Sequence, residues 1–218
     1  MRDLLIFGIG KFAEVAAYYF ETEGGFRVTA FVVDDAYFSS HTFYGRPVLR
    51  ASELPGHEFC RGFFFAAVGA SQNNSAREEK LNYLCSLGLT PASFVSKFAY
   101  IGANVVLGKH CFILENNVIQ PFVVIGDNVV LWSGNHIGHH SSVGNHCFVS
   151  SHCVISGSVE VQNNAFLGVN STILPGVIVG ASCFISAGAL VTNSLEPNCA
   201  FLAQQPHKSV TGGARWVI

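Results

Sequence analysis

The sequence predicts an α/β domain over residues 1–95, a parallel β-helix over residues 96–195 and a C-terminal tail over residues 196–218. An aliphatic residue at every sixth position predicts the β-helix, and a strand–glycine turn–helix pattern at the start of the chain predicts the α/β domain. A third observation is the scarcity of charge, because only four Asp, Glu, Lys or Arg residues occur between Ile101 and Val191. Such a surface is expected to be buried in part by identical neighbours in a homotrimer.

The repeat fits neither the 3.6-residue period of a helix nor the two-residue period of a strand. Each hexad is expected to give one short strand and one tight turn, and three hexads to give one coil of a triangular prism. The aliphatic residue and the small residue two positions before it should point inward. Gly and Asn should occupy the turn positions that need a positive φ. The aliphatic positions are Ile101, Leu107, Ile113, Ile119, Ile125, Leu131, Ile137, Val143, Val149, Ile155, Val161, Leu167, Ile173, Val179, Ile185 and Val191. The residues that often follow them are Gly102, Gly108, Gly126, Gly138, Gly144, Gly168 and Gly180.

The first part of the chain reads as a compact βαβ unit with a possible anion site. Strands are expected at Leu4–Phe7 and Arg27–Val33, with an amphipathic helix between them. Gly8 and Gly10 would let the helix N-terminus approach an anion, and Asp34 and Asp35 could accept hydrogen bonds from a ribose or a base. The alternative is a plain βα turn followed by a solvated strand end.

The rest of this part adds one strand and one helix. Residues 62–68 form a third apolar run, and residues 75–87 are expected to be helical. This completes a small α/β domain ahead of the repeat.

Composition excludes several classes of partner. The formal net charge is −2 and there is no basic run, which argues against nucleic acid and anionic membrane surfaces. No stretch of 18 apolar residues occurs, so neither a signal peptide nor a transmembrane helix is expected. The seven cysteines lack a CxxC pair, and Cys111, Cys147, Cys153 and Cys183 occupy small inward positions of the hexads. Unpaired core cysteines are consistent with a reducing cytoplasm.

An aromatic series predicts where the homotrimer contact lies. Phe148, Phe166 and Phe184 all precede an inward aliphatic residue and are one coil apart, with Phe112 two coils earlier. They should stack as an exposed ladder, which a soluble monomer rarely leaves in water. We expect a neighbouring chain to cover it; the alternative is that residues 201–218 fold back over it.

The segment from Asn135 to His152 is rich in histidine. These histidines could serve as metal ligands, as a general base in catalysis, or as polar residues of solvated turns. His140, His146 and His152 are six residues apart, so within one chain they should face three directions and cannot share a tetrahedral ion. A metal held between chains stays open, as in the γ-class carbonic anhydrases, which use the same solenoid. A histidine that takes a proton from an attacking amine fits better.

The hexads resemble the left-handed β-helix of the hexapeptide-repeat acyltransferases. A glycine-loop βαβ domain followed by this β-helix resembles the nucleotide-sugar acyltransferases of bacterial surface glycans. This group includes the PglD-like N-acetyltransferases of UDP-4-amino-sugars and the sialic-acid O-acetyltransferase-like proteins. The resemblance implies that Gly8, Gly10, Asp34 and Asp35 hold the nucleotide, with Lys11 near a phosphate. The chain departs from the PglD-like Gly-His-Gly loop end, because it has Lys11-Phe12-Ala13 there.

The resemblance also implies a catalytic pair and a thioester groove. His139 matches the family's base, which stands two residues after an inward aliphatic residue. The next residue is acidic in the PglD-like enzymes but is His140 here, so the two histidines could share or exchange roles. Backbone amides along a groove between subunits should hold acetyl-CoA, and Lys208 could meet a phosphate of that co-substrate. The residues matched to the groove are Ser150, Gly157, Val169, Asn170, Ala187 and Gly188.

The expected function is acetyl transfer from acetyl-CoA to the amine of a UDP- or dTDP-linked amino-deoxyhexose, without a metal. The amine would attack the thioester directly, His139 would take its proton, and backbone amides would stabilise the oxyanion. O-acetylation of a sugar hydroxyl is the first alternative. A non-catalytic nucleotide-sugar-binding scaffold and a metal enzyme with its ion between subunits are the others.

Overall fold

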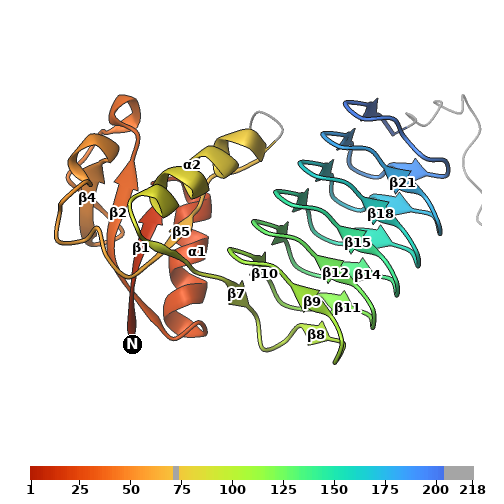
Figure 1. Cartoon of the computed structure of the whole chain (residues 1–218), viewed down its shortest axis with the longest axis horizontal. Helices are drawn as coiled ribbons and strands as arrows, with labels where there is room; N and C mark the ends of the chain where they lie inside the picture. The colour runs from red at the N-terminus through yellow and green to blue at the C-terminus, as the bar shows by residue number, and fades with distance from the viewer. Residues whose placement is uncertain (71–73, 204–218) are drawn as a thin grey trace, which may run out of the picture.

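The computed structural model describes residues 1–70 and 74–203, which form an α/β domain packed against one end of a triangular β-prism (Figure 1). Lys208 and the rest of the expected tail lie outside the described residues. Within the described part of the chain, no helix is both long enough and apolar enough to cross a membrane.

The α/β domain is built on one sheet of strand order β3-β4-β2-β1-β5-β6. All neighbouring strands are parallel except the hairpin β3–β4. The strands are β1 (Arg2–Phe7), β2 (Phe26–Val33), β3 (Thr42–Phe43), β4 (Arg46–Arg50), β5 (Phe63–Ala66) and β6 (Thr90–Pro91). The helices are α1 (Lys11–Thr22) and α2 (Ser75–Ser86), with 3₁₀ turns η1 (Asp35–Tyr37) and η2 (Ala51–Glu53).

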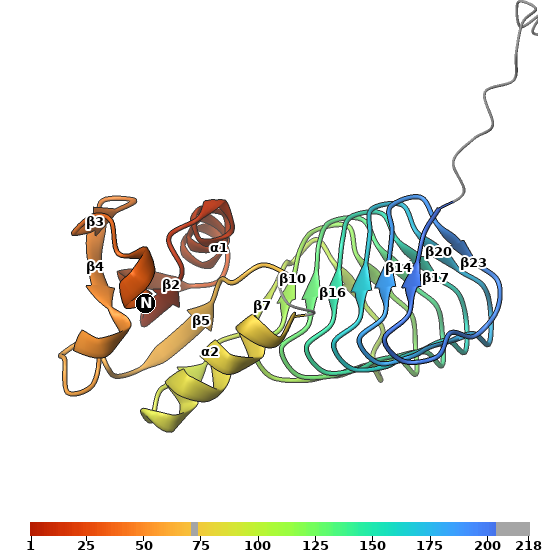
Figure 2. The ribbon, with the colours of Figure 1, turned by 90° about the horizontal axis from the view of Figure 1, so that it is seen from above.

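Both faces of this sheet are covered, as Figure 2 shows with α1 and α2 on either side of β1 and β5. Ala13, Ala16 and Phe20 of α1 pack on one face, in a cluster that also contains Phe112 and Val130 of the prism. Leu84 of α2 packs on the other face. The core of the α/β domain therefore extends onto the outer face of the first prism sheet and is separate from the core inside the prism.

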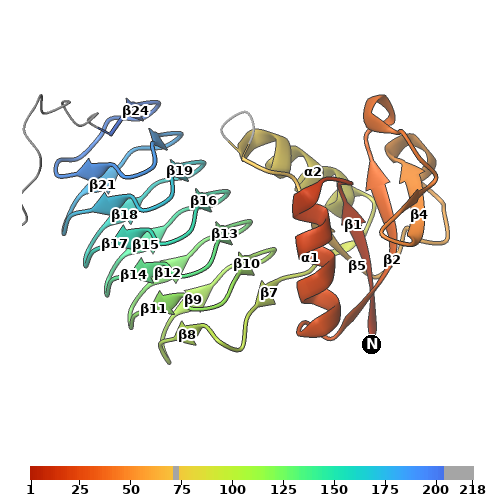
Figure 3. The ribbon, with the colours of Figure 1, turned by 180° about the vertical axis from the view of Figure 1, so that it is seen from behind.

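The prism consists of three parallel sheets, in which strands pair with the strand 18 residues later, as Phe112 pairs with Val130 (Figure 3); the last pair, β22 with β24, is 16 residues apart. The first sheet contains β7 (Phe94–Val95), β10 (Phe112–Ile113), β13 (Val130–Leu131), β16 (Phe148–Val149), β19 (Phe166–Leu167), β22 (Phe184–Ile185) and β24 (Ala200–Phe201). The second contains β8 (Tyr100–Ile101), β11 (Val118–Ile119), β14 (His136–Ile137), β17 (Val154–Ile155), β20 (Thr172–Ile173) and β23 (Leu190–Val191). The third contains β9 (Val106–Leu107), β12 (Val124–Ile125), β15 (Ser142–Val143), β18 (Glu160–Val161) and β21 (Ile178–Val179).

The predicted inward positions are confirmed. The aliphatic residues of the hexads and the small residues before them form one core, and Cys111, Cys147, Cys153 and Cys183 are buried free thiols within it. Burial raises the pKa of Cys147 to about 12 and that of Cys111 to about 11. These thiols are core residues and are not nucleophiles.

The prediction that Gly and Asn occupy the turn positions with positive φ is confirmed at several turns, such as Asn116, Asn128 and Gly134, but the glycines directly after the aliphatic residues are not at these positions. Positive φ occurs three residues after the aliphatic residue, at fourteen successive turns from His110 to Gly188. The glycine directly after the aliphatic residue is needed for close packing of coils instead. A Cβ on Gly126 would lie 2.4 Å from Asn145 Oδ1, and one on Gly138 would lie 2.5 Å from the backbone nitrogen of Gly157.

The aromatic ladder forms, but it is shorter than expected. Phe148 stacks on Phe166 at 5.6 Å between ring centroids, and Phe166 stacks on Phe184 at 5.1 Å. Phe112 is excluded from the exposed part because the α/β domain buries it completely, in contact with Phe12. The sequence pattern does not reveal this contact because it joins residues that are far apart in the chain.

Candidate active site

His139 and His140 lie together on one corner of the prism, in the turn between β14 and β15, and both are exposed. Their Nδ1 atoms are 3.1 Å apart. One of the two atoms must donate the hydrogen and the other must accept it, because two N–H groups cannot face each other at this distance. The pair is therefore joined through Nδ1, and each ring keeps its Nε2 for another partner.

Residues of the neighbouring coils hold this pair. The Oε1 atom of Gln120 accepts the backbone N–H of His139 at 2.9 Å. The His139 ring lies over Gly157, where a Cβ would come within 2.8 Å of Cε1 and 3.0 Å of Nε2. The ring of Phe122 stacks on His140, with 4.6 Å between centroids and 24° between planes. Sequence reasoning missed Gln120 and Phe122, although each lies about one coil before the histidines and could be found from the 18-residue spacing.

The residues matched to the thioester groove do not all lie on this corner. Gly157 lies beneath His139, one coil later on the same corner. The other five lie on the corner between the first and second sheets. These five are Ser150, Val169, Asn170, Ala187 and Gly188. Within one chain the structure therefore does not bring the histidine pair and this second corner together.

The third corner joins the prism to the α/β domain. His110 is buried there; its Nε2 accepts the backbone N–H of Ala66 at 2.9 Å, and its Nδ1 faces Asn128 Oδ1 at 2.9 Å. Burial lowers the pKa of His110 to about 3, so the ring is neutral. His146, two coils after His110, is next to Glu78 of α2. His140, His146 and His152 do lie on three different corners, and among the described residues no group of His, Cys, Asp or Glu could hold a metal ion.

The residues matched to the nucleotide lie at the carboxyl ends of the strands. Gly8 follows β1 with φ +122, and a Cβ there would lie 2.8 Å from the Ala67 carbonyl oxygen after β5. Gly10 is the N-cap of α1. Strands β1 and β5 are adjacent at the point where the strand order reverses, which is where open α/β sheets bind ligands. Lys11 is exposed and pairs with Glu14.

The two aspartates have partners within the chain. Asp34 accepts a hydrogen bond from Lys80 Nζ of α2 at 2.8 Å. Asp35 accepts hydrogen bonds from the hydroxyl of Ser52 at 2.5 Å and from its backbone N–H at 3.1 Å. These bonds hold the pKa of Asp35 below its ordinary value. A nucleotide hydroxyl would have to share or replace these contacts.

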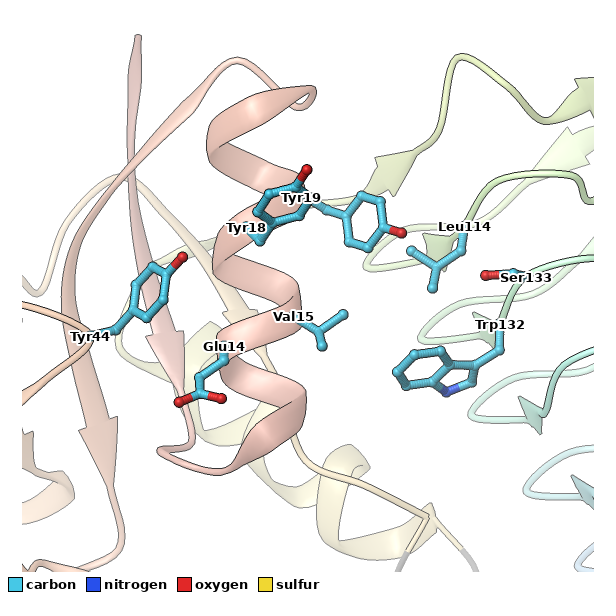
Figure 4. A pocket seen from close by; sticks show the side chains of 8 residues that line it. All are labelled: Glu14, Val15, Tyr18, Tyr19, Tyr44, Leu114, Trp132 and Ser133. Atoms are coloured by element: carbon cyan, nitrogen blue, oxygen red, sulfur yellow. The ribbon is translucent and has the colours of Figure 1, made fainter.

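A pocket of about 490 Å³ lies between α1 and the prism (Figure 4). The rings of Tyr18 and Tyr19 project from α1, and Trp132 faces them from the prism. Behind the pocket, Glu115 accepts the hydroxyl of Tyr19 at 2.8 Å, and burial together with this carboxylate raises the pKa of Tyr19 to about 12. The lining residues are Glu14, Val15, Tyr18, Tyr19, Tyr44, Leu114, Trp132 and Ser133. This pocket lies on the corner between the first and second sheets, which we call the thioester corner because it carries five of the residues matched to the thioester groove. The lining of the pocket includes a carboxylate and no cationic side chain. The pocket was not predicted from the sequence.

Comparison with protein families identifies the prism. Residues 122–157 and 158–193 match the family of the bacterial transferase hexapeptide (six repeats). These two stretches of the prism carry the hexapeptide repeat of that family. The predicted resemblance and the predicted fold class, an α/β domain followed by a left-handed parallel β-helix, are confirmed. A comparison with curated proteins found no match.

Solved structures with this hexapeptide domain also share the α/β domain. PerB from Caulobacter crescentus, crystallised with CoA and GDP-perosamine, superimposes with a TM-score of 0.82 at 25% sequence identity, over 92% of this chain and 93% of that chain. The acetyltransferase domain of PglB from Neisseria gonorrhoeae gives a TM-score of 0.79 at 18% identity, over 93% and 97%. WeeI from Acinetobacter baumannii gives 0.71 at 18% identity, over 90% and 94%. The last two matches show the shared fold alone.

Proposed function

We propose that this protein is an acetyl-CoA-dependent N-acetyltransferase that acts on a nucleotide-linked amino sugar for bacterial surface glycan biosynthesis in the cytoplasm. The observation that carries the proposal is the exposed, hydrogen-bonded pair His139–His140 on a corner of a hexapeptide prism. Two further findings support it. The attached α/β domain has its glycine turn at the strand-order reversal, and PerB, which has both domains, was crystallised with CoA and GDP-perosamine.

The Nδ1–Nδ1 contact of the pair supports a separate role for each nitrogen. If Nδ1 of His139 donates to Nδ1 of His140, Nε2 of His139 is an acceptor, and within the described residues it has no hydrogen-bond partner. It can then take the proton of the sugar amine as the amine attacks the thioester carbonyl. The new C–N bond forms, the C–S bond breaks, and CoA leaves as the thiolate or thiol. If the shared hydrogen points the other way, His140 becomes the base.

We propose that a complete site forms between chains of a homotrimer. The histidine corner and the corner that carries Ser150, Val169 and Gly188 are separated by the second sheet of the prism. A second chain could place its histidine corner beside the thioester corner of the first. The pocket beside α1 would then receive the amino sugar, because its aromatic side chains pack on a sugar ring and the Glu14 carboxylate can accept a hydrogen bond from the sugar.

Thiol release from acetyl-CoA tests the proposal, with a panel of UDP-, dTDP- and GDP-linked 4-amino sugars. We expect release with one of them, lowered about a hundredfold or more in His139→Ala, as is usual when a general base is removed. A larger loss in His140→Ala than in His139→Ala would make His140 the base. Release only with hydroxyl acceptors would indicate O-acetylation. Nucleotide-sugar binding without any release would indicate a non-catalytic scaffold.

Complementation tests whether the site is shared between chains. His139→Ala removes the base, and Val169→Trp places a bulky ring on the exposed thioester corner. Each variant alone should be inactive. When equal amounts of the two chains are unfolded and refolded together, about one quarter of all sites in the randomly mixed trimers should combine two intact halves. Recovery of activity supports a shared site, and a mixture that stays inactive contradicts it.

A further inference from the structure

Phe122 occupies a backbone position that is unfavourable for its side chain. It is one of the fourteen repeat turns with a positive φ, and its φ is 67°. The other turns place His, Asn, Ser or Gly there; Phe122 is the one large apolar residue among them. A bulky residue in the left-handed region is an outlier, and such strain often marks a functional constraint.

Packing in the core does not explain Phe122. Its side chain is 56% exposed. Its backbone N–H donates to Asn104 Oδ1 at 3.1 Å, a bond that any residue except proline could make. The ring contact that the structure gives it is the stack on His140, at 4.6 Å and 24°. A small polar residue would satisfy the turn equally well, so the selective feature of Phe122 is its contact with the histidine pair.

We propose that Phe122 is a positioning residue, which fixes the plane of the His140 imidazole so that its Nδ1 atom faces Nδ1 of His139. This inference rests on the proposed function of the pair. Both rings are exposed, so water could otherwise let His140 rotate and break the Nδ1 contact. Stacking holds the plane of the His140 ring. Within that plane, the orientation that directs Nδ1 at His139 is the one that gains the Nδ1–Nδ1 hydrogen bond. His140 can then select the tautomer of His139 that leaves Nε2 as the acceptor.

Three variants separate this role from a structural one. Phe122→Asn suits the left-handed backbone and removes the ring, so we expect its melting temperature to equal or exceed that of the wild type. Its kcat should nevertheless fall by about tenfold or more, with the KM values for both substrates unchanged. Phe122→Tyr keeps the stack and should retain wild-type kcat. In a His140→Ala background, Phe122→Asn should cause no further loss, because its effect is exerted through His140.

An unchanged kcat in Phe122→Asn would overturn the inference. The inference would also fail if Phe122→Asn lowered kcat equally in the His140→Ala background, or if the loss of kcat came with a change of oligomeric state. A second measurement does not depend on turnover. The ¹⁵N shifts of the imidazoles should report one tautomer for His140 in the wild type and in Phe122→Tyr, and a mixture in Phe122→Asn. The same tautomer in all three would refute the inference, even if the panel of amino sugars gave no acetyl transfer and the proposed function itself had failed.

Discussion

At the scale of single residues, Gly157 determines how closely His139, the proposed base, can pack on the next coil. An added Cβ would lie 2.8 Å from Cε1 of His139, so the ring would have to move. The backbone φ of Gly157 is not positive, so alanine fits the turn itself. We predict that Gly157→Ala keeps its melting temperature but loses about tenfold or more in kcat, since a small misplacement of a catalytic group is costly. Steady-state kinetics with Ser156→Ala as the control would check this, and equal kcat in both variants would contradict it.

The buried His110 should make the stability of the protein fall at acidic pH. Burial lowers the pKa of His110 to about 3 in the folded chain, against roughly 6.5 in the unfolded chain. Between these values the unfolded chain binds the additional proton, so the free energy of unfolding decreases as pH falls, by at most about 1.4 kcal/mol per pH unit from this group. Protonation would also oppose the nearby Arg77 and His146 charges.

Urea unfolding of His110→Asn at several pH values between 6.5 and 4 tests this prediction. Asparagine tolerates the φ of 58° at this turn, but it loses the ring that accepts the Ala66 N–H. The variant should therefore be less stable at neutral pH and show a smaller decrease in stability toward acid. The same pH dependence in both proteins would show that His110 is not the group responsible.

At the scale of the elements, successive coils are joined by a ladder of side-chain oxygens at the third corner. Asn163 Oδ1 accepts the Asn145 N–H at 2.9 Å, and Asn145 Oδ1 accepts the Asp127 N–H at 2.8 Å. Asn145→Ala should cost ~1 kcal/mol in the free energy of unfolding, the usual value of one such bond. Asn145→Asp keeps the acceptor and should cost less. Denaturant unfolding would measure both, and equal losses would mean that the ladder bond is not the cause.

Features of the elements that depend on local sequence could be predicted, and features that depend on contacts between coils could not. The period of six is local, so strands, inward residues and coil number follow from it directly. The role of the glycines directly after the aliphatic residues could not be predicted, because it depends on a residue in the next coil, as Gly126 does on Asn145. The separation of His139 from Val169 and Gly188 could have been found by counting in steps of 18, since Gly157 shares a corner with His139 and the other two do not.

At the scale of the whole molecule, the placement of the α/β domain was beyond sequence reasoning. The expected βαβ unit is present, but its contact with the prism depends on residues that no local pattern marks. By its spacing, Phe112 is one more residue of the aromatic ladder, but it is buried beneath α1. The pocket beside Trp132 exists only because of this docking. Whether a sugar site forms there therefore depends on how firmly the two parts are held together.

Arg77 of α2 is central to that contact. Its guanidinium is fully buried and donates to Asn128 Oδ1 at 3.1 Å, Asn74 Oδ1 at 3.2 Å and the His146 carbonyl at 2.8 Å. Burial lowers its pKa to about 10, so the group is still charged at neutral pH. The acceptors are neutral amide and carbonyl oxygens. Because Asn128 and His146 lie in the turns of two successive coils and Asn74 is the N-cap of α2, Arg77 joins these three segments.

We predict that Arg77→Met uncouples the α/β domain from the prism. The methionine fills part of the space but leaves the buried backbone carbonyl oxygens of Asn128 and His146 without the Arg77 donor, at a cost of roughly 2–4 kcal/mol. The coils of the prism are stabilised by their neighbours along the stack, so this cost should fall on the α/β domain. Calorimetry should show a transition at lower temperature for that domain while the prism transition stays unchanged, and proteolysis near residues 92–97 should become faster. The exposed Arg61→Met serves as the control; if both variants melt alike, Arg77 does not hold the domains together, and the pocket beside α1 must be maintained by the apolar contacts around Phe112.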